Sequence, residues 1–285
     1  MLERARVYSR MIKLSHSVFA LPFALAAAAL AATQVPVTAG QLALLVVAMV
    51  AARSTAMGFN RIADRRIDAV NTRTAGREIP SGQLTVGAAW AFTLASAVLF
   101  VASAALLSPL VLALSPVALA VVWGYSLTKR FTALCHLVLG VALGLAPTGV
   151  WIALTGSYGP EPLLLSLAVA TWVAGFDMLY ACQDIEFDRD TGLHSFPATY
   201  GLRPALVASG VLHLATVGLL AAMPVYGSLG VAYGVGVGLI AAVLAYEHWI
   251  VGLGDLARID KAFFDLNGAV ALLFLGFVLV DVALI

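Results

Sequence analysis

Residues 163–188 read LLLSLAVATWVAGFDMLYACQDIEFD. The part up to residue 181 is predominantly apolar and close to the roughly 20 residues that a helix needs to cross a bilayer. The run then passes into a series of polar side chains, Asp177, Tyr180, Asp184 and Asp188. The last three recur at every fourth residue, and Asp177 lies about one turn deeper, so a continuous helix would place them on one face. The stretch predicts a membrane-spanning helix that ends in an acidic motif.

The composition extends this interpretation to the whole chain. Of its 285 residues 62% are hydrophobic and only 11% charged, against about 25% charged in soluble domains. The mean hydropathy is +0.98 and the formal net charge is +1. These values exclude a soluble enzyme, a disordered chain and a nucleic-acid binder with a basic face. Cys135 and Cys182 are too few for a disulfide framework and are expected to be free thiols.

Nine apolar runs are long enough to be membrane spans. We therefore expect an all-α integral membrane protein in which residues 1–285 form a single transmembrane domain. The nine spans are expected near residues 16–34, 41–59, 85–107, 110–127, 132–154, 163–181, 204–223, 229–249 and 263–284.

The positive charges predict the orientation. All 16 lysines and arginines fall in the N-terminal tail or in the regions of the connections that nine spans would place on the same side, with Arg53 inside the span next to its connection. The positive-inside rule assigns this side to the cytoplasm, so the N-terminus is expected inside and the C-terminus outside. Only Glu161 and Asp281 among the acids fall on the other side. We therefore expect a multi-pass protein of the cell's inner (plasma) membrane, with its active site at the cytoplasmic face.

A second acidic motif lies at residues 60–68, at the end of another predicted span. Asn60, Asp64 and Asp68 recur at every fourth residue, which again puts them on one helix face. The alternative is an ordinary solvated helix end in which the carboxylates pair with arginines of the same helix. Those arginines are Arg61, Arg65 and Arg66.

The two motifs together favour cation binding. A carboxylate such as Asp177 inside an apolar span costs roughly 2.5–3.5 kcal/mol, which argues for a function. No Cys/His cluster has zinc spacing, whereas carboxylate and amide oxygens suit Mg²⁺. Mg²⁺ usually shares its coordination shell with substrate phosphates, so the motifs predict Mg²⁺ bound together with a diphosphate. The expected metal ligands are Asn60, Asp64, Asp68, Asp184 and Asp188.

A diphosphate also requires cationic partners. Arg53 lies two turns before the first motif inside a span, and Arg77 follows that motif in a loop. Lys129, one turn after Tyr125, ends another span. Each has a structural alternative: pairing with Asp177 for Arg53, positive-inside bias for Arg77 and an interfacial anchor for Lys129.

The remaining polar residues give weaker signals. The five histidines, His136 among them, form no spacing pattern. Glu186 and Asp190 lie off the acidic face and are expected to be solvated. Four further acids are expected to be ordinary residues at the membrane edge: Glu247, Asp255, Asp260 and Asp265.

With these motifs assembled, the chain resembles the UbiA-type intramembrane aromatic prenyltransferases along nearly its whole length. The family's first motif, Asn-Asp-x-x-Asp-x-x-x-Asp, is matched at Asn60, Asp64 and Asp68, while Arg61 stands at its first aspartate. The family's Tyr-x-x-x-Lys element matches Tyr125 and Lys129. Its second motif, Asp-x-x-Tyr-Ala-x-Gln-Asp-x-x-x-Asp, is matched by Asp177, Tyr180, Ala181, Gln183, Asp184 and Asp188.

The resemblance implies Mg²⁺-dependent transfer of a polyprenyl group from an allylic polyprenyl diphosphate to a hydroxylated aromatic acid at the lipid bilayer, with no role for nucleic acid. The catalytic residues it implies are Asp64, Asp68, Asp177, Tyr180, Asp184 and Asp188. The substrate-binding residues it implies are Arg53, Asn60, Arg77, Tyr125, Lys129 and Gln183.

Three stretches are similar to one bacterial branch of the family, which is 4-hydroxybenzoate polyprenyltransferase-like and includes the enzyme of the futalosine route to menaquinone. They read KLSHSVFALPFAL, NRIADRRIDAVNTRTAGREIPSG and QDIEFDRDTGLHSFPATYG. The branch implies 4-hydroxybenzoate or 1,4-dihydroxy-6-naphthoate as acceptor, in ubiquinone or menaquinone biosynthesis. The alternatives are another aromatic or a tetrapyrrole acceptor, or a cation or metabolite transporter, which would need acids open to both sides. A CDP-alcohol phosphotransferase is disfavoured because its Asp-Gly-x-x-Ala-Arg signature is absent.

Overall fold

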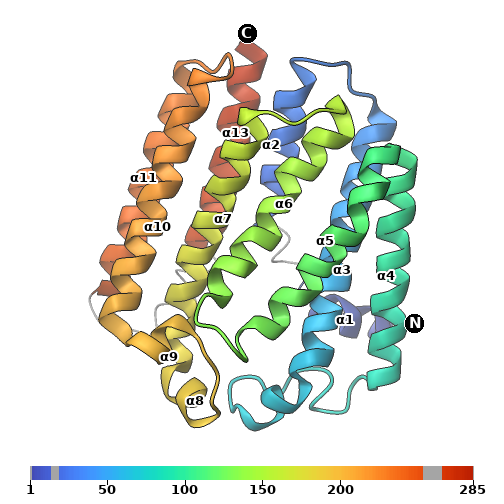
Figure 1. The fold of residues 1–285 in the computed structure, drawn as a ribbon, viewed down its shortest axis with the longest axis vertical. Helices are drawn as coiled ribbons and strands as arrows, with labels where there is room; N and C mark the ends of the chain where they lie inside the picture. The colour runs from blue at the N-terminus through green and yellow to red at the C-terminus, as the bar shows by residue number, and fades with distance from the viewer. Residues whose placement is uncertain (1, 14–18, 253–264, 285) are drawn as a thin grey trace. The chain divides into compact units, whose positions relative to one another are not determined.

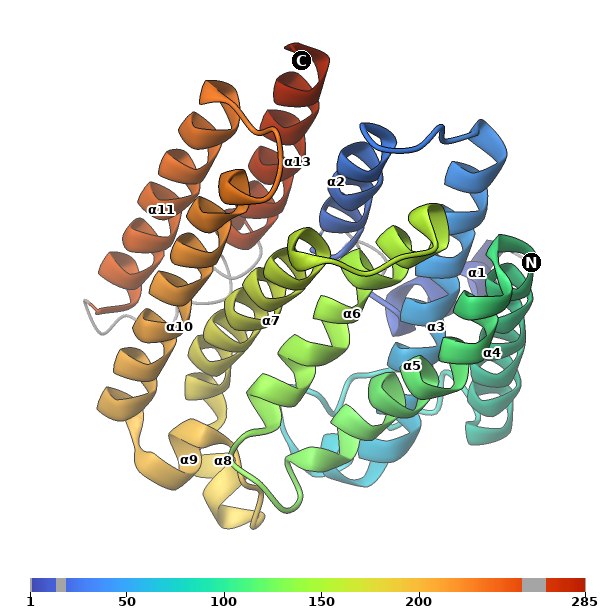
Figure 2. The ribbon, with the colours of Figure 1, turned by 45° about the horizontal axis from the view of Figure 1, so that its top comes forward.

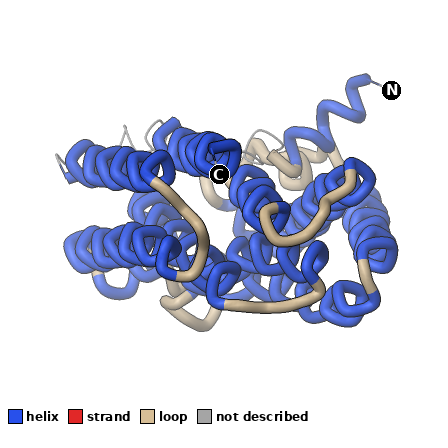
Figure 3. The backbone as a smooth tube through the Cα atoms, turned by 90° about the horizontal axis from the view of Figure 1, so that it is seen from above, coloured by secondary structure: helices blue, strands red, loops and turns tan. Residues whose placement is uncertain are grey.

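The computed structural model describes residues 2–13, 19–252 and 265–284, and all regular structure in these ranges is helical, without a strand (Figure 3). The longer helices are α1 (Leu2–Met11), α2 (Leu21–Ala32), α3 (Ala39–Val70), α4 (Val86–Leu107), α5 (Pro109–Thr128), α6 (Cys135–Thr155), α7 (Pro160–Ala181), α10 (Leu202–Ala222), α11 (Val231–Gly252) and α13 (Asn267–Leu284). The short ones are η2 (Cys182–Asp184), α8 (Ile185–Asp190), α9 (Phe196–Tyr200) and η3 (Met223–Val225).

Eight helical segments in the described ranges are long and apolar enough to cross a membrane. This agrees with the all-α membrane prediction but does not confirm nine spans. The first expected span, near residues 16–34, contains the 12-residue helix α2, which at 1.5 Å per residue is about 18 Å long. That is less than the roughly 30 Å of hydrocarbon in a bilayer. Residues 16–18 of this expected span lie outside the described residues, and the inside position of the N-terminus stays a prediction.

The chain divides into two compact units. The first comprises Met1–Ser17 and Ala39–Leu127, and the second comprises Val18–Thr38 and Thr128–Ile285. The first motif lies in the first unit and the second motif in the second unit. The expectation of a single domain stays a prediction.

In the first unit, α3 packs along α4. Gly58 makes this approach possible, because a Cβ at this position would overlap the side chain of Thr93. α5 is attached to α3 through Trp123, whose indole Nε1 donates a hydrogen bond to Thr55 Oγ1 at 3.0 Å. The same indole stacks on Phe59, with ring centroids 5.2 Å apart. Tryptophan therefore fixes α5 next to the part of α3 that leads into the first motif.

In the second unit, α6 and α7 run side by side, and α7 also packs against α10 (Figures 1 and 2). Glycines on α6 allow the close contact with α7, as small residues commonly do between membrane helices. A Cβ at Gly140 would overlap the carbonyl oxygen of Ala170, and one at Gly144 would lie 2.6 Å from that of Ser166. Helix α11 packs against both α10 and α13, and α2 packs against α6 and α13.

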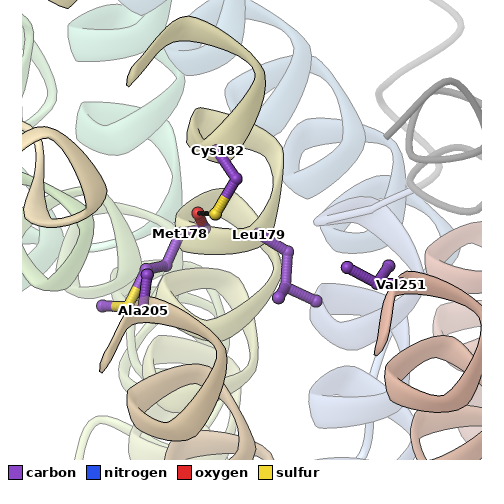
Figure 4. Packing of buried hydrophobic residues seen from close by; sticks show 5 residues of the cluster. All are labelled: Met178, Leu179, Cys182, Ala205 and Val251. Carbon is purple, nitrogen blue, oxygen red and sulfur yellow. Dashed lines mark hydrogen bonds between the residues drawn. The ribbon is translucent and has the colours of Figure 1, made fainter. Parts of the chain in front are cut away.

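The end of α7 that carries the second motif is fixed by a buried apolar cluster (Figure 4). Its members come from α7, η2, α10 and α11: Met178, Leu179, Cys182, Ala205 and Val251. The Cys182 thiol donates to the Met178 carbonyl oxygen at 3.4 Å. Cys135 and Cys182 are both free, as predicted.

Candidate active site

The first motif lies on one uninterrupted helix, as predicted. α3 continues to Val70, and its Asp64 and Asp68 side chains are almost fully buried, with exposed fractions of 2% and 3%. Asn60 Nδ2 donates to Asp64 Oδ2 at 3.2 Å and to Ser126 Oγ on α5 at 3.3 Å. Both contacts are made by the amide nitrogen of Asn60, so they fix the orientation of this side chain beside Asp64.

Arg77 forms a close ion pair with the first motif. Its Nη1 lies 2.7 Å from Asp68 Oδ1 and 2.8 Å from Asp68 Oδ2. The loop that brings Arg77 back contains Thr74, whose hydroxyl donates to the Asp68 carbonyl oxygen at 3.1 Å. Arg77 thus lies at the motif, where its charge can contact a bound anion.

Two arginines on α3 itself donate to backbone carbonyl oxygens. Arg61 Nε donates to the Met11 carbonyl oxygen at 3.3 Å, and Arg65 Nη1 donates to that of Ile62 at 2.8 Å. Arg66 is exposed. The ion pair observed at Asp68 is made by the loop residue Arg77.

Two further cationic candidates are positioned by backbone contacts. Arg53 Nη2 donates to the Lys13 carbonyl oxygen at 3.4 Å, while its buried Nε has no hydrogen-bond partner among the described residues. Lys129 directly follows α5, one turn beyond the half-buried Tyr125. Its carbonyl oxygen accepts a hydrogen bond from the His194 backbone N–H at 2.7 Å.

The second motif departs from a continuous α-helix, and that part of the prediction is wrong. α7 ends at Ala181, a 3₁₀ turn covers Cys182–Asp184, and α8 begins at Ile185. A 3₁₀ turn advances about 120° per residue instead of 100°, so Asp184 and Asp188 are rotated away from the face that carries Tyr180. Asp188 is buried, Gln183 and Asp184 are half-buried, and Glu186 and Asp190 are exposed as predicted.

Asp177 has a partner that the local sequence does not indicate. His136, the second residue of α6, places Nδ1 2.6 Å from Asp177 Oδ2. The suggested pairing of Arg53 with Asp177 is not the observed one. The sequence carries no signal for the His136 contact, because the two residues lie 41 positions apart on different helices.

Glu247 was expected to be an ordinary edge acid, but it is buried, with an exposed fraction of 2%. Asn267 Nδ2 donates to Glu247 Oε1 at 2.6 Å, and Trp172 Nε1 donates to Asn267 Oδ1 at 2.8 Å. A polar chain therefore connects α11, α13 and α7. Asp265 is exposed, and the expected edge acids Asp255 and Asp260 lie outside the described residues.

The donor set of the motifs fits magnesium. In the described part of the chain, no group of three or more His, Cys, Asp or Glu side chains is close enough together to form a complete metal cage. Mg²⁺ rarely uses such cages; it is commonly bound by one or two carboxylates, waters and substrate phosphates. Asp64 and Asp68 with the Asn60 amide supply this type of partial, all-oxygen set.

A sequence model of the UbiA prenyltransferase family matches residues 20–279. The chain belongs to the UbiA prenyltransferase family. This confirms the resemblance found from the motifs, and it identifies the protein as a prenyltransferase of a membrane-embedded family rather than a transporter.

Curated relatives are similar over most of the chain. A 4-hydroxybenzoate octaprenyltransferase of Sodalis glossinidius is 31% identical over 242 residues, covering 84% of this chain and 82% of the relative. One of Alkalilimnicola ehrlichii is 29% identical over 238 residues, covering 84% and 81%.

Solved structures confirm the fold. An apo UbiA homologue from Aeropyrum pernix K1 superposes with a TM-score of 0.85 at 38% identity, covering 93% of this chain and 98% of its own. A UbiA homologue from Archaeoglobus fulgidus, bound to GPP and Mg²⁺, gives a TM-score of 0.73 at 21% identity, covering 97% and 99%.

Proposed function

We propose that this prenyltransferase transfers a polyprenyl group from an allylic polyprenyl diphosphate to a hydroxylated aromatic acid, either 4-hydroxybenzoate or 1,4-dihydroxy-6-naphthoate. The product would be an intermediate of ubiquinone or menaquinone biosynthesis. The observation that carries the proposal is the cluster of the buried Asp64 and Asp68 carboxylates and the half-buried Asn60 amide, with a guanidinium beside it. The names of the curated relatives support the acceptor class.

Both acidic motifs contribute to binding the donor's diphosphate group. When bound, magnesium supplies positive charge that neutralises the leaving diphosphate. We assign its ligands to Asn60, Asp64, Asp68, Asp184 and Asp188. The homologue structure that contains both GPP and Mg²⁺ supports this use of a divalent metal.

The cationic residues neutralise the phosphate charge that remains. Arg53 carries a buried Nε that has no partner in the described part of the chain, and a phosphate oxygen would satisfy this donor. Arg77 exchanges part of its contact with Asp68 for a contact with phosphate. Lys129 provides a point charge, and Tyr125 and Gln183 complete the substrate-binding set.

The reaction follows from this charge distribution. The allylic C–O bond breaks and its electron pair leaves with the diphosphate, whose negative charge the cations stabilise. The electron-rich aromatic ring attacks the resulting allylic cation, a C–C bond forms, and the ring loses a proton. Asp177 or Tyr180 stabilises the cation or orients the acceptor. We place this chemistry at the cytoplasmic face of the plasma membrane, where the isoprenoid chain can remain in the apolar phase.

Product formation by mass spectrometry tests the proposal. Purified protein in nanodiscs would receive Mg²⁺, an allylic diphosphate and both acceptors in competition under anaerobic conditions, with an EDTA-treated control. We expect one prenylated acid, identified by its mass, and no product with EDTA. Release of diphosphate without prenylation of either acid would mean that the acceptor is another aromatic or a tetrapyrrole compound. An untouched donor, beside an active family member, would refute the proposed function.

A further inference from the structure

His136 is buried between two partners that belong to the second motif and to the loop that follows it. Its exposed fraction is 3%. On one side Nδ1 lies 2.6 Å from Asp177 Oδ2. On the other side Nε2 accepts a hydrogen bond from the backbone N–H of Phe196 at 3.3 Å. The imidazole thus connects the carboxylate at the end of α7 to the start of α9.

The Phe196 contact determines the tautomer of the ring. A backbone N–H always donates, so the Nε2 atom that receives it carries no proton. The ring proton is then on Nδ1, which donates it to Asp177 Oδ2. The two contacts together fix the ring, and through the ring they fix the position of Asp177 Oδ2.

The contact occupies only one oxygen of Asp177. Among the described residues, no hydrogen bond is made by Oδ1, and 27% of the side chain is exposed. A carboxylate fixed through one oxygen keeps a defined rotamer while the other oxygen remains available to a ligand.

The loop that supplies the Phe196 N–H is itself attached to the second motif. The Leu193 N–H donates to the Asp188 carbonyl oxygen at 2.7 Å, and the His194 N–H donates to that of Lys129 at 2.7 Å. Ser195 then caps α9, because its Oγ accepts from the Ala198 N–H at 3.4 Å. The segment between Asp188 and Phe196 therefore has its own anchors, so the loop does not depend on His136 alone.

We propose that His136 is a positioning residue for prenyl transfer, which holds the Asp177 carboxylate in the orientation that the reacting substrate requires. The inference rests on the proposed function, because it names how Asp177 is prepared for its role there. A residue that only filled space between α6 and α7 would need neither the donor on Nδ1 nor the acceptor on Nε2.

Two substitutions separate the two contacts. In His136→Asn the amide nitrogen can occupy the place of Nδ1, which retains the donor to Asp177 and loses the acceptor for Phe196. In His136→Gln the longer amide reaches the place of Nε2 and loses the donor to Asp177. The matched control is His194→Gln, a change in an exposed side chain of the same loop.

We expect His136→Gln to lower kcat by about 10- to 100-fold, as misplaced catalytic groups do, with the KM for the donor diphosphate changed less than about 3-fold. His136→Asn should keep kcat within about 3-fold of the wild type, and the control should be unchanged. Asp177→Asn should reproduce the loss, and adding His136→Gln to it should lower kcat no further. Equal effects of His136→Asn and His136→Gln would overturn the inference, because the orientation of Asp177 would then not matter.

Nitrogen NMR of ¹⁵N-histidine-labelled protein tests the pair without any turnover, with His136→Asn identifying the signal. We expect a neutral ring protonated on Nδ1. A ring protonated on Nε2 would overturn the inference. If the wild type has this tautomer but forms no product, the proposed function and the catalytic part of the inference are both refuted. If the wild type is active but its His136 ring is protonated on Nε2, the inference alone is refuted.

Discussion

The ion pair between Arg77 and Asp68 allows a test that separates stability from activity. Asp68 is 3% exposed, and Arg77 Nη1 contacts both of its carboxylate oxygens at 2.7 and 2.8 Å. Removing one partner of a buried pair costs about 3–5 kcal/mol, since a charge is left without compensation. Because the Arg77 side chain is 23% exposed, water relieves part of this cost, and we expect Arg77→Met to lower the free energy of unfolding by about 3 kcal/mol.

Removing both charges should restore stability without restoring function. In the double variant Arg77→Met with Asp68→Leu, no buried charge remains, and apolar replacements of similar size are often neutral or stabilising. We expect its stability within about 1 kcal/mol of the wild type. It should nevertheless form no product, because Asp68 is a proposed metal ligand.

Thermal inactivation provides the assay. The monomeric fraction left after heating would be measured by size-exclusion chromatography, and about 3 kcal/mol corresponds to a midpoint lowered by about 6–12 °C. The control is Arg66→Met, an exposed arginine of α3 that should change the free energy by less than about 0.5 kcal/mol. A double variant as unstable as Arg77→Met, or one with wild-type activity, would refute the reasoning.

Three further predictions concern packing and polar contacts in the second unit, each measured by the same thermal assay. Gly140→Ala should lower the free energy of unfolding by about 1–3 kcal/mol through overpacking, since its Cβ would overlap a backbone carbonyl of α7. The control Gly149→Ala, whose Cβ meets nothing within 4 Å, should not destabilise the protein. A larger loss of stability in Gly149→Ala than in Gly140→Ala would contradict the α6–α7 contact. Asp281→Ala should lower the free energy of unfolding by about 1–2 kcal/mol, because Asp281 accepts hydrogen bonds from two backbone N–H groups at the start of α11, at 2.7 and 3.1 Å. An unchanged unfolding midpoint would contradict this role as a helix cap. Asn267→Leu should cost about 2–3 kcal/mol, because a buried indole N–H and Glu247 lose their partner, and wild-type stability would mean that this polar chain is not formed.

The sequence predicted the features that depend on local periodicity. The first motif lies on one face of α3 because an uninterrupted apolar helix simply continues through Asn60, Asp64 and Asp68. The second motif has the same spacing, yet η2 interrupts it. The spacing of polar residues is compatible with both an α-helix and a 3₁₀ turn, and the packing of Cys182 in the cluster of Figure 4 is not visible in the local sequence.

Contacts between distant helices were the features that the sequence did not reveal. His136 and Asp177 meet only because glycines such as Gly140 let α6 and α7 approach closely. Glu247 was expected at the membrane edge from its place near the end of an apolar run, but Asn267 on another helix keeps it buried. In both cases a single polar residue in an apolar helix signals a partner without identifying it.

The most direct test of the central claim compares product formation by the wild type with that of Asp64→Asn and Asp184→Asn, one carboxylate from each motif. Glu186→Gln, in the same acidic segment but exposed, is the matched control. If both motifs bind the metal and diphosphate, each Asp→Asn variant should fold normally and form at least about 100-fold less prenylated product, and the control should match the wild type. Wild-type turnover by either Asp→Asn variant would contradict the assignment of these carboxylates and with it the proposed mechanism.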